Sequence, residues 1–380
     1  MRDAVNLRAS VKTKIRDYEI WRCELPTGRV IGDCTCHYDV LNVYALALKT
    51  DSGHTGWGFG ETLSKGVFTK SAPWMSLMPS LEELRRKFLA KVWPLIGESE
   101  LSSAWERRME FFPDFGFQSV AVRLALWDLK AKEKEQPLHQ MLGSTRDRVR
   151  TYGSGLDFPL TDAEAVDIFR RFVNRGFTAV KVKVGDPKPE RDLHRLQLVR
   201  EVVGENAEIA VDANEAWTCD EALERIQFYI REGVRLSYVE DPLPRGDIDG
   251  FVRLNAMSDV DIVGHDSILD YRELRRFVER GAFSRLRVSA DIDHALRCAE
   301  IATEFGVPLI FGNSLFETSV HAALACASTD RLEFSDLAWN RLPAHPLEIS
   351  EGYALAPSRP GHGFDPDRDA LQDFSRPDPS

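Results

Sequence analysis

The chain has 380 residues, a net charge of −11, 43% hydrophobic residues and 29% charged residues. This length exceeds one average domain and fits a single α/β barrel of roughly 200 to 250 residues beside a smaller domain. The acidic balance argues against a general nucleic-acid binder, because phosphate binding needs a basic field, although a bound cation and local arginines can still prepare one pocket for an anion.

Neither the start of the chain nor its cysteines indicate an exported or membrane protein. Residues 1–20 alternate charges with short apolar pairs, and no later stretch has the length of a membrane span. The six cysteines are scattered, and the close pair Cys34 and Cys36 lacks the second pair that would complete a zinc site. We therefore expect a cytoplasmic protein with reduced thiols and no membrane partner.

The first 143 residues predict an α+β domain. An extended region over 20–48, a turn at 51–53 and a glycine-rich segment at 56–61 suggest antiparallel strands. Amphipathic segments at 81–92 and 119–133 then predict helices. The Pro- and Asp-rich tail is expected to pack back on this domain, so that residues 345–380 complete it.

From about residue 148 onward, short apolar runs alternate with amphipathic stretches, which predicts βα units and a parallel sheet. The expected strands are 149–152, 179–184, 209–212, 236–240, 262–264, 286–288, 309–311 and 332–334. The expected helices are 162–175, 191–203, 220–232, 271–279, 295–305 and 318–327. Eight strands with intervening helices predict an α/β barrel of the TIM type over residues 144–344.

Charged side chains follow consecutive strands of this expected barrel. Lys181 and Lys183 end the second strand, Asp212 ends the third, and Glu240 ends the fourth. Catalytic groups of such barrels lie at the C-terminal ends of the strands. Alternation along a strand places both lysines on the same inward face, so we expect one pocket that contains two ammonium groups and the carboxylates.

This combination suggests proton abstraction next to a carboxylate. Paired lysines depress each other's pKa, and a lysine so depressed can act as a base near neutral pH. Asp212 and Glu240 offer the charged oxygen ligands that Mg²⁺ prefers, and a metal that holds a substrate carboxylate stabilises the enediolate formed when the α-proton leaves. Either carboxylate alone would more often be a helix cap or an ion-pair partner, but the joint pattern favours metal ligation. We assign Lys183 as the base and Lys181 to an orienting role.

At these residues the chain resembles the mandelate racemase and muconate lactonizing branch of the enolase superfamily, and acid-sugar dehydratases within it. Lys181-Val-Lys183, the Val-Asp-Ala-Asn motif that ends at Asn214, and Val-Glu-Asp-Pro around Glu240 carry the likeness. Gly-His-Thr-Gly-Trp-Gly from Gly53 and Ala-Leu-Trp-Asp-Leu-Lys from Ala125 extend it to the first domain. The resemblance implies a modified (β/α)7β TIM barrel with an N-terminal α+β capping domain, Mg²⁺ as cofactor, a small carboxylate as substrate, and a homo-oligomer.

In this family, loops of the capping domain close the barrel mouth and select the substrate, and the matching segments here are 26–38 and about 60–70. The first segment carries Arg29, His37 and Tyr38. These side chains are plausible contacts to an anionic, hydroxyl-rich substrate, and Asn214 is a further expected contact. Solvated surface positions are the competing interpretation for the capping residues.

The chain departs from the family pattern at three strands. After strand five, His265 takes the aligned position of the third metal ligand, whereas Asp266 is the harder oxygen donor, and both stay open. Strand six lacks the muconate-type lysine and offers Arg285 and Arg287, which would bind a carboxylate or polarise a leaving group. Strand seven lacks the racemase histidine and is followed by Glu317, which resembles a pocket residue of the muconate type.

With one base and no partner base on the opposite face, the simplest predicted reaction is elimination. Lys183 would take the α-proton, and the β-hydroxide would leave with a proton from His37, Tyr38 or the lysine itself. The predicted activity is dehydration of an aldonate or aldarate to a 2-keto-3-deoxy acid. A cycloisomerase, racemase or epimerase that uses the same enediolate is the alternative within enzymes. A non-catalytic, ligand-binding relative is the alternative of another class.

Overall fold

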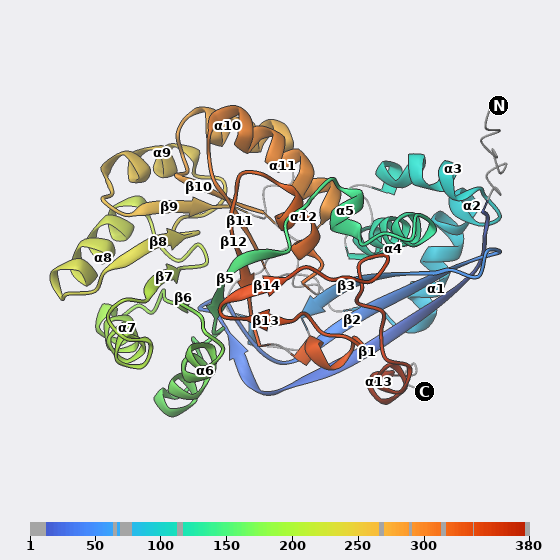
Figure 1. Ribbon diagram of the computed structural model, residues 1–380. Helices are drawn as coiled ribbons and strands as arrows, with labels where there is room; N and C mark the ends of the chain where they lie inside the picture. The colour runs from blue at the N-terminus through green and yellow to red at the C-terminus, as the bar shows by residue number, and fades with distance from the viewer. Residues whose placement is uncertain are drawn as a thin grey trace, which may run out of the picture.

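The computed structural model describes residues 13–63, 67–68, 78–111, 117–265, 270–288, 291–312, 317–336 and 338–376. The chain forms an N-terminal antiparallel sheet with its own helices and a closed parallel barrel that follows it (Figure 1). The predicted fold class, a modified TIM barrel with an α+β capping domain, is confirmed. None of the helices in these ranges combines the length and the apolar character needed to cross a bilayer.

The N-terminal sheet has the strand order β1-β2-β3, and the short strand β4 pairs with β2. The strands are β1 Ile15–Gly32, β2 Cys36–Thr50, β3 Thr55–Leu63 and β4 Val67–Phe68. The helices that follow are α1 Leu81–Lys91, α2 Trp93–Ile96, α3 Leu101–Glu106, the 3-10 helix η2 Arg107–Phe111, α4 Phe117–Glu133 and α5 Leu138–Met141. Glycine is required in β3 because a Cβ at Gly58 would overlap the carbonyl oxygen of Ala121 in α4.

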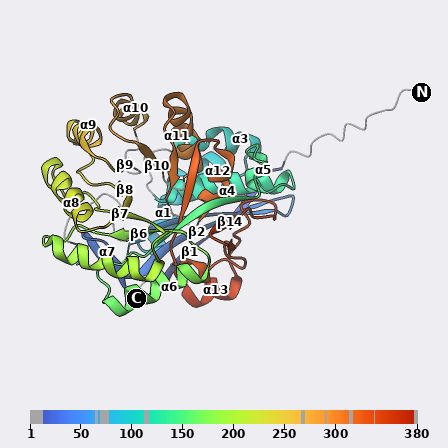
Figure 2. The same cartoon turned by 60° about the vertical axis from the view of Figure 1, so that its left-hand side comes forward.

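The eight parallel strands close into a barrel because β12 pairs with β5. They are β5 Arg148–Ser154, β6 Ala179–Lys183, β7 Glu208–Asp212, β8 Leu236–Glu240, β9 Asp261–Gly264, β10 Arg285–Val288, β11 Leu309–Phe311 and β12 Thr329–Phe334. The helices are α6 Asp162–Asn174, α7 Pro189–Val203, α8 Cys219–Arg231, α9 Ile248–Met257, α10 Tyr271–Glu279, α11 Ile292–Phe305 and α12 Ser319–Ala325. Figure 2 shows α6 to α11 arranged around the outside of the strands. Each predicted strand and helix is present, and α9 is a helix that the sequence patterns missed.

The C-terminal segment returns to both parts of the molecule. It contains the 3-10 helix η3 Ala338–Arg341, the hairpin strands β13 Ile349–Ser350 and β14 Tyr353–Leu355, and the helix α13 Arg368–Phe374. β14 pairs antiparallel with β5, so the hairpin extends the sheet at that barrel strand. α13 lies against β1 of the N-terminal sheet, as Figure 1 shows.

The barrel interior is filled by a layer of apolar side chains beneath the strand ends. Its members come from six strands and are Tyr152, Ala179, Ala210, Tyr238, Val263 and Ile310. Inward-facing residues two positions further along a strand lie in the next layer up. This periodicity places the charged residues of β6, β7 and β8 directly above an apolar floor.

Candidate active site

Three neighbouring strands bring the predicted catalytic residues into register. Lys183 on β6 pairs with Asp212 on β7, and Asp212 pairs with Glu240 on β8. The side chains of Lys181, Lys183, Asp212 and Glu240 are 7% exposed or less. Four charged groups therefore share a buried space at the C-terminal end of the barrel, where barrel enzymes carry their chemistry.

The two lysines bind different carboxylates. Lys183 donates hydrogen bonds from Nζ to Asp212 Oδ2 at 2.6 Å and to Asn214 Oδ1 at 3.0 Å. Lys181 donates to Glu240 Oε1 at 2.6 Å and lies 3.3 Å from Asp212 Oδ2. The arrangement joins five of the predicted site residues in one buried network.

Two residues from distant strands complete this network. Glu333 on β12 accepts a hydrogen bond from Arg287 at 2.7 Å and lies 3.0 Å from the Lys181 ammonium. Arg287 on β10 also lies 2.8 Å from Glu240 Oε1. Sequence reasoning missed Glu333, although a glutamate between two apolar residues of the eighth strand was a visible signal. Arg287 was predicted, and the structure places it against a predicted metal ligand.

The buried charges shift one another's pKa. Burial would raise the pKa of Asp212, but Lys183 and Lys181 outweigh burial and hold that pKa well below its usual range. Burial raises the pKa of Glu240 to about 7, against the opposing charges of Arg287 and Lys181. Burial lowers the pKa of Lys183, yet Asp212 outweighs it, so this pKa lies above its ordinary value. Lys181 does lower the pKa of Lys183, as expected for a lysine pair, but Asp212 raises it by more. The expected net depression of the lysine pKa is therefore not found, because each ammonium faces a carboxylate.

The loops that leave β7 and β8 are held in a strained backbone conformation. Asn214, Glu215 and Asp241 have φ angles of 44°, 63° and 43°. Residues other than glycine rarely adopt this left-handed region, and such strain is concentrated at functional sites. A hydrogen bond of 2.7 Å from the Glu215 N–H to the Asp241 carbonyl joins the two loops.

The donor set at Asp212 and Glu240 fits a magnesium ion. Both residues offer carboxylate oxygens, which Mg²⁺ prefers. Glu240 Oε2 is buried and makes no hydrogen bond within the described part of the chain. An oxygen of this kind is costly to bury without a partner, and a cation would supply one.

The predicted third ligand is not brought to these two carboxylates. His265 is 3% exposed, and its ring nitrogens lie 3.5 Å from Asp241 Oδ2 and 3.6 Å from Glu215 Oε1. Over the described ranges, the ligand atoms of Asp212, Glu240 and His265 do not gather within 4.8 Å of one another. Asp266, the alternative ligand, lies outside the described residues.

A turn of the N-terminal sheet lies on the barrel mouth. The Gly32 N–H donates to the Leu156 carbonyl at 2.9 Å, and Cys34 Sγ donates to the Ala213 carbonyl at 3.3 Å. These contacts reach the loops after β5 and β7. The turn between β1 and β2 therefore covers the strand ends that carry the buried charges.

The capping residues predicted to bind substrate have different surroundings. Tyr38 is buried, and burial raises its pKa well above the ordinary value. His37 is half-buried with its ring 6.1 Å from that of Phe158. Arg29 forms an ion pair of 3.4 Å with Asp167 on α6.

Two other predicted contacts lie apart from the network in different ways. Arg285 pairs with Asp261 at the start of β9 and with Asp330 near the start of β12. It therefore lies toward the N-terminal end of the barrel, away from the charged layer. Glu317 is fully buried, and burial raises its pKa to about 8 against the opposing charge of Arg175.

The acids after strand six tie the capping domain to the barrel. Asp291 caps α11 by accepting the backbone N–H groups of Asp293 and His294, and it forms an ion pair with the buried Arg123 of α4. Asp293 accepts a hydrogen bond from Trp127 Nε1 at 3.2 Å. Asp291 is therefore a helix cap, and both acids also contact side chains of α4.

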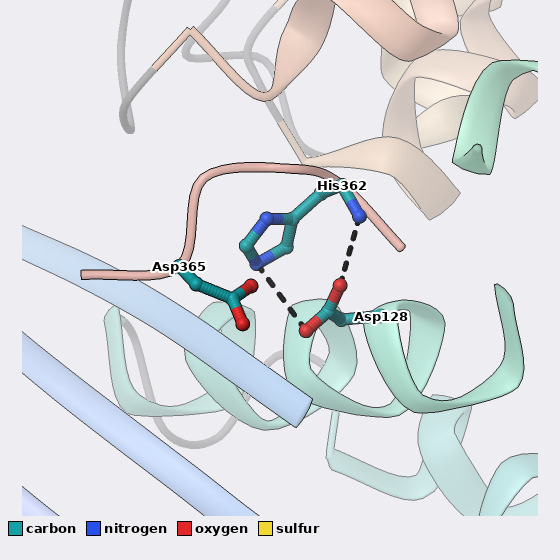
Figure 3. A group of neighbouring side chains, drawn as sticks. All are labelled: Asp128, His362 and Asp365. Carbon is teal, nitrogen blue, oxygen red and sulfur yellow. Dashed lines mark hydrogen bonds and ion pairs between the residues drawn. The ribbon is translucent and has the colours of Figure 1, made fainter. Parts of the chain in front are cut away.

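Asp128, His362 and Asp365 form a second group of potential metal ligands (Figure 3). The Lys132 ammonium already lies 2.8 Å from Asp128 and 2.7 Å from Asp365. Both ring nitrogens of His362 contact backbone groups, at 2.9 and 3.0 Å. Because a cation and the backbone occupy these ligand atoms, the cluster is a structural tie between α4, β3 and the C-terminal segment.

Comparison with known proteins gives relatives that cover most of the chain. Arabinonate dehydratase of Saccharolobus solfataricus is 27% identical over 348 residues, which span 85% of this chain and 88% of that protein. Other relatives are a cycloisomerase of 3,6-anhydro-alpha-L-galactonate and epimerases, so the likeness covers more than one reaction class.

Solved structures agree with this result. A crystal structure described as a candidate mandelate racemase from Mesorhizobium loti has a TM-score of 0.87 and 35% identity, over 97% of this chain and 96% of that one. L-talarate dehydratase from Polaromonas sp. JS666, crystallised with Mg and L-glucarate, has a TM-score of 0.76 and 25% identity, over 96% of this chain and 98% of that one. A family profile described as enolase C-terminal domain-like matches residues 164–370, more than half of the chain. The chain therefore belongs to this family, in the mandelate racemase and muconate lactonizing branch of the enolase superfamily.

Proposed function

We propose that this protein is a magnesium-dependent acid-sugar dehydratase that converts an aldonate or aldarate to a 2-keto-3-deoxy acid. The observation that carries the proposal is the Lys183 ammonium beside Asp212, in register with Glu240 at the C-terminal end of the barrel. A relative named for arabinonate dehydration supports a sugar acid as the substrate class.

Asp212 and Glu240 would hold the metal ion. Of the two residues predicted as a third ligand, His265 contacts Glu215 and Asp241 instead, and Asp266 stays the predicted candidate. When bound there, Mg²⁺ supplies positive charge that stabilises the negative charge developing on the substrate carboxylate as the α-proton leaves. Lys181, hydrogen-bonded to Glu240, orients that ligand. The metal, the homo-oligomer and the cytoplasmic location are predictions.

Engagement of Asp212 by the metal ion would offset the charge that raises the pKa of Lys183. In the proposed reaction, Lys183 in its neutral form then takes the proton from the carbon next to the carboxylate. Asp212 and Asn214 hold its nitrogen at 2.6 and 3.0 Å. The hydroxyl on the next carbon leaves as water after it gains a proton from His37, Tyr38 or Lys183 itself. Burial keeps the Tyr38 hydroxyl protonated but, by raising its pKa, also makes it a weak proton donor. Tautomerisation of the resulting enol gives the 2-keto-3-deoxy acid.

The test is a screen of mono- and diacid sugars with Mg²⁺ in D₂O, scored for 2-keto product and for deuterium at the α-carbon. A keto product from one acid would support the dehydratase and name its substrate. Exchange without a keto product would indicate an epimerase or cycloisomerase instead. A folded protein that gives neither signal over a broad library, but binds a sugar acid, would be the non-catalytic relative.

Lys183→Met tests the assigned base. The variant should keep Mg²⁺ binding and lose turnover by at least about 100-fold, because general base catalysis typically contributes 10²–10⁴-fold. The measurement is kcat on the substrate found in the screen, together with calorimetric Mg²⁺ titration and circular dichroism to verify folding. Near-normal kcat in a folded variant would remove the proposed mechanism.

A further inference from the structure

Four buried side chains form a closed ring of alternating charge at the candidate metal site. Lys181 lies 2.6 Å from Glu240 Oε1 and 3.0 Å from Glu333 Oε1. Arg287 lies 2.8 Å from Glu240 Oε1 and 2.7 Å from Glu333 Oε2. Each cation therefore contacts both carboxylates, and none of the four side chains is more than 11% exposed.

The two carboxylate oxygens of Glu240 have different surroundings in the ring. Both cations contact Oε1, whereas Oε2 is buried without a hydrogen bond to the described residues. Each cation also contacts Glu333, so neither cation can turn wholly toward Glu240. The ring thus holds the Glu240 carboxylate in one orientation and leaves one of its oxygens for another positive group.

We propose that Glu333 is a positioning residue that orients Glu240 to bind the divalent metal ion. This inference rests on the proposed function, because that function assigns Glu240 to the metal. Glu333 also balances the charge of the buried network. Within the described ranges this network joins three cationic and three acidic side chains, namely Lys181, Lys183, Arg287, Asp212, Glu240 and Glu333.

Glu333→Gln removes the charge with little change in shape. The network then carries one negative charge fewer than in the wild type, and Glu240 becomes the remaining carboxylate partner of Arg287 within the ring. Both changes oppose a dication at Glu240. We expect Mg²⁺ affinity to fall by about 10- to 100-fold, the range known for residues that orient metal ligands. Glu333→Asp keeps the charge and should lie closer to the wild-type affinity.

The experiment is calorimetric titration of Mg²⁺ into the substrate-free full-length chain, for the wild type, Glu333→Gln, Glu333→Asp and the double variant Glu333→Gln/Arg287→Met. The double variant removes one cation as well and so restores the wild-type charge of the network. It should therefore bind Mg²⁺ at least about tenfold more tightly than Glu333→Gln, and the double-mutant comparison isolates this coupling. Circular dichroism melts verify that each chain is folded.

The outcomes separate this inference from the proposed function. A folded Glu333→Gln with wild-type affinity, or a double variant no better than the single one, would overturn the role of Glu333 and leave the dehydratase proposal standing. If Glu333→Gln does not fold, the other two variants decide. An equal loss of Mg²⁺ affinity in Glu333→Asp and in the double variant, each compared with the wild type, would also overturn the role of Glu333. A wild-type chain that binds no Mg²⁺ would remove the metal site itself.

Discussion

Asp128→Asn should destabilise the protein strongly, because Asp128 is a fully buried acceptor of three hydrogen bonds. The backbone N–H groups of Trp57 and His362 and the Lys132 ammonium each lie 2.8 Å from its carboxylate. Asparagine can place its oxygen toward Trp57 and Lys132, but its NH₂ group then faces the His362 N–H. One buried N–H loses its acceptor, which costs about 1–3 kcal/mol, and the buried ion pair to Lys132 is lost as well. Breaking such a pair typically costs about 3–5 kcal/mol when the partner is left unpaired. Because Lys132 keeps Asp365 as a partner, we expect a total near the lower end of the summed losses, about 4–5 kcal/mol.

Urea unfolding followed by circular dichroism measures this change as a shift in midpoint at constant slope. The matched control is Asp365→Asn, which removes the other carboxylate partner of the same lysine. The Asp365 side chain is 47% exposed, so the control should lose less than about 1 kcal/mol. Equal losses in the two variants, or a loss below about 1 kcal/mol for Asp128→Asn, would refute the idea that this cluster ties the domains together.

Three further predictions concern groups outside the candidate site. Burial lowers the pKa of His321 from 6.5 to about 3, so its contribution to stability is complete above pH 6.5 and is lost as the pH falls toward 3. His321→Gln keeps a hydrogen-bond donor and an acceptor but does not titrate. When the pH falls from 7.5 to 5, its free energy of unfolding, measured in urea, should decrease by about 2 kcal/mol less than that of the wild type. An equal decrease in the two proteins would contradict this prediction. Thr218→Ala removes the cap of α8 and should cost about 1 kcal/mol by the same assay, whereas an unchanged midpoint would show that the capping box contributes nothing. Arg285→Met should have a KM for the substrate within about twofold of the wild-type value, because the ion pairs of Arg285 lie toward the N-terminal end of the barrel. A KM raised tenfold or more would indicate that Arg285 contacts the substrate after all.

The amino-acid sequence was sufficient to predict the barrel and the central part of the candidate site. Apolar runs of strand length, each followed by an amphipathic helix, have one efficient way to bury their surfaces. Alternation along β6 then requires Lys181 and Lys183 to share a face, and the strand ends of β7 and β8 place Asp212 and Glu240 beside them. These consequences follow from local periodicity and from the order of neighbouring strands.

Contacts between residues far apart in the sequence depended on the closed barrel. Glu333 reaches Lys181 from a strand on the other side of β5, and no local pattern specifies that distance. The same holds for the lysine pKa values, which a nearby carboxylate raises although a lysine pair alone would lower them. Arg285 shares a face with Arg287 but lies two residues earlier in its strand, so it meets acids toward the opposite end of the barrel. Periodicity determined which way these side chains face, and only the tertiary structure decided which charges meet, because electrostatic partners depend on distances in space that the fold alone sets.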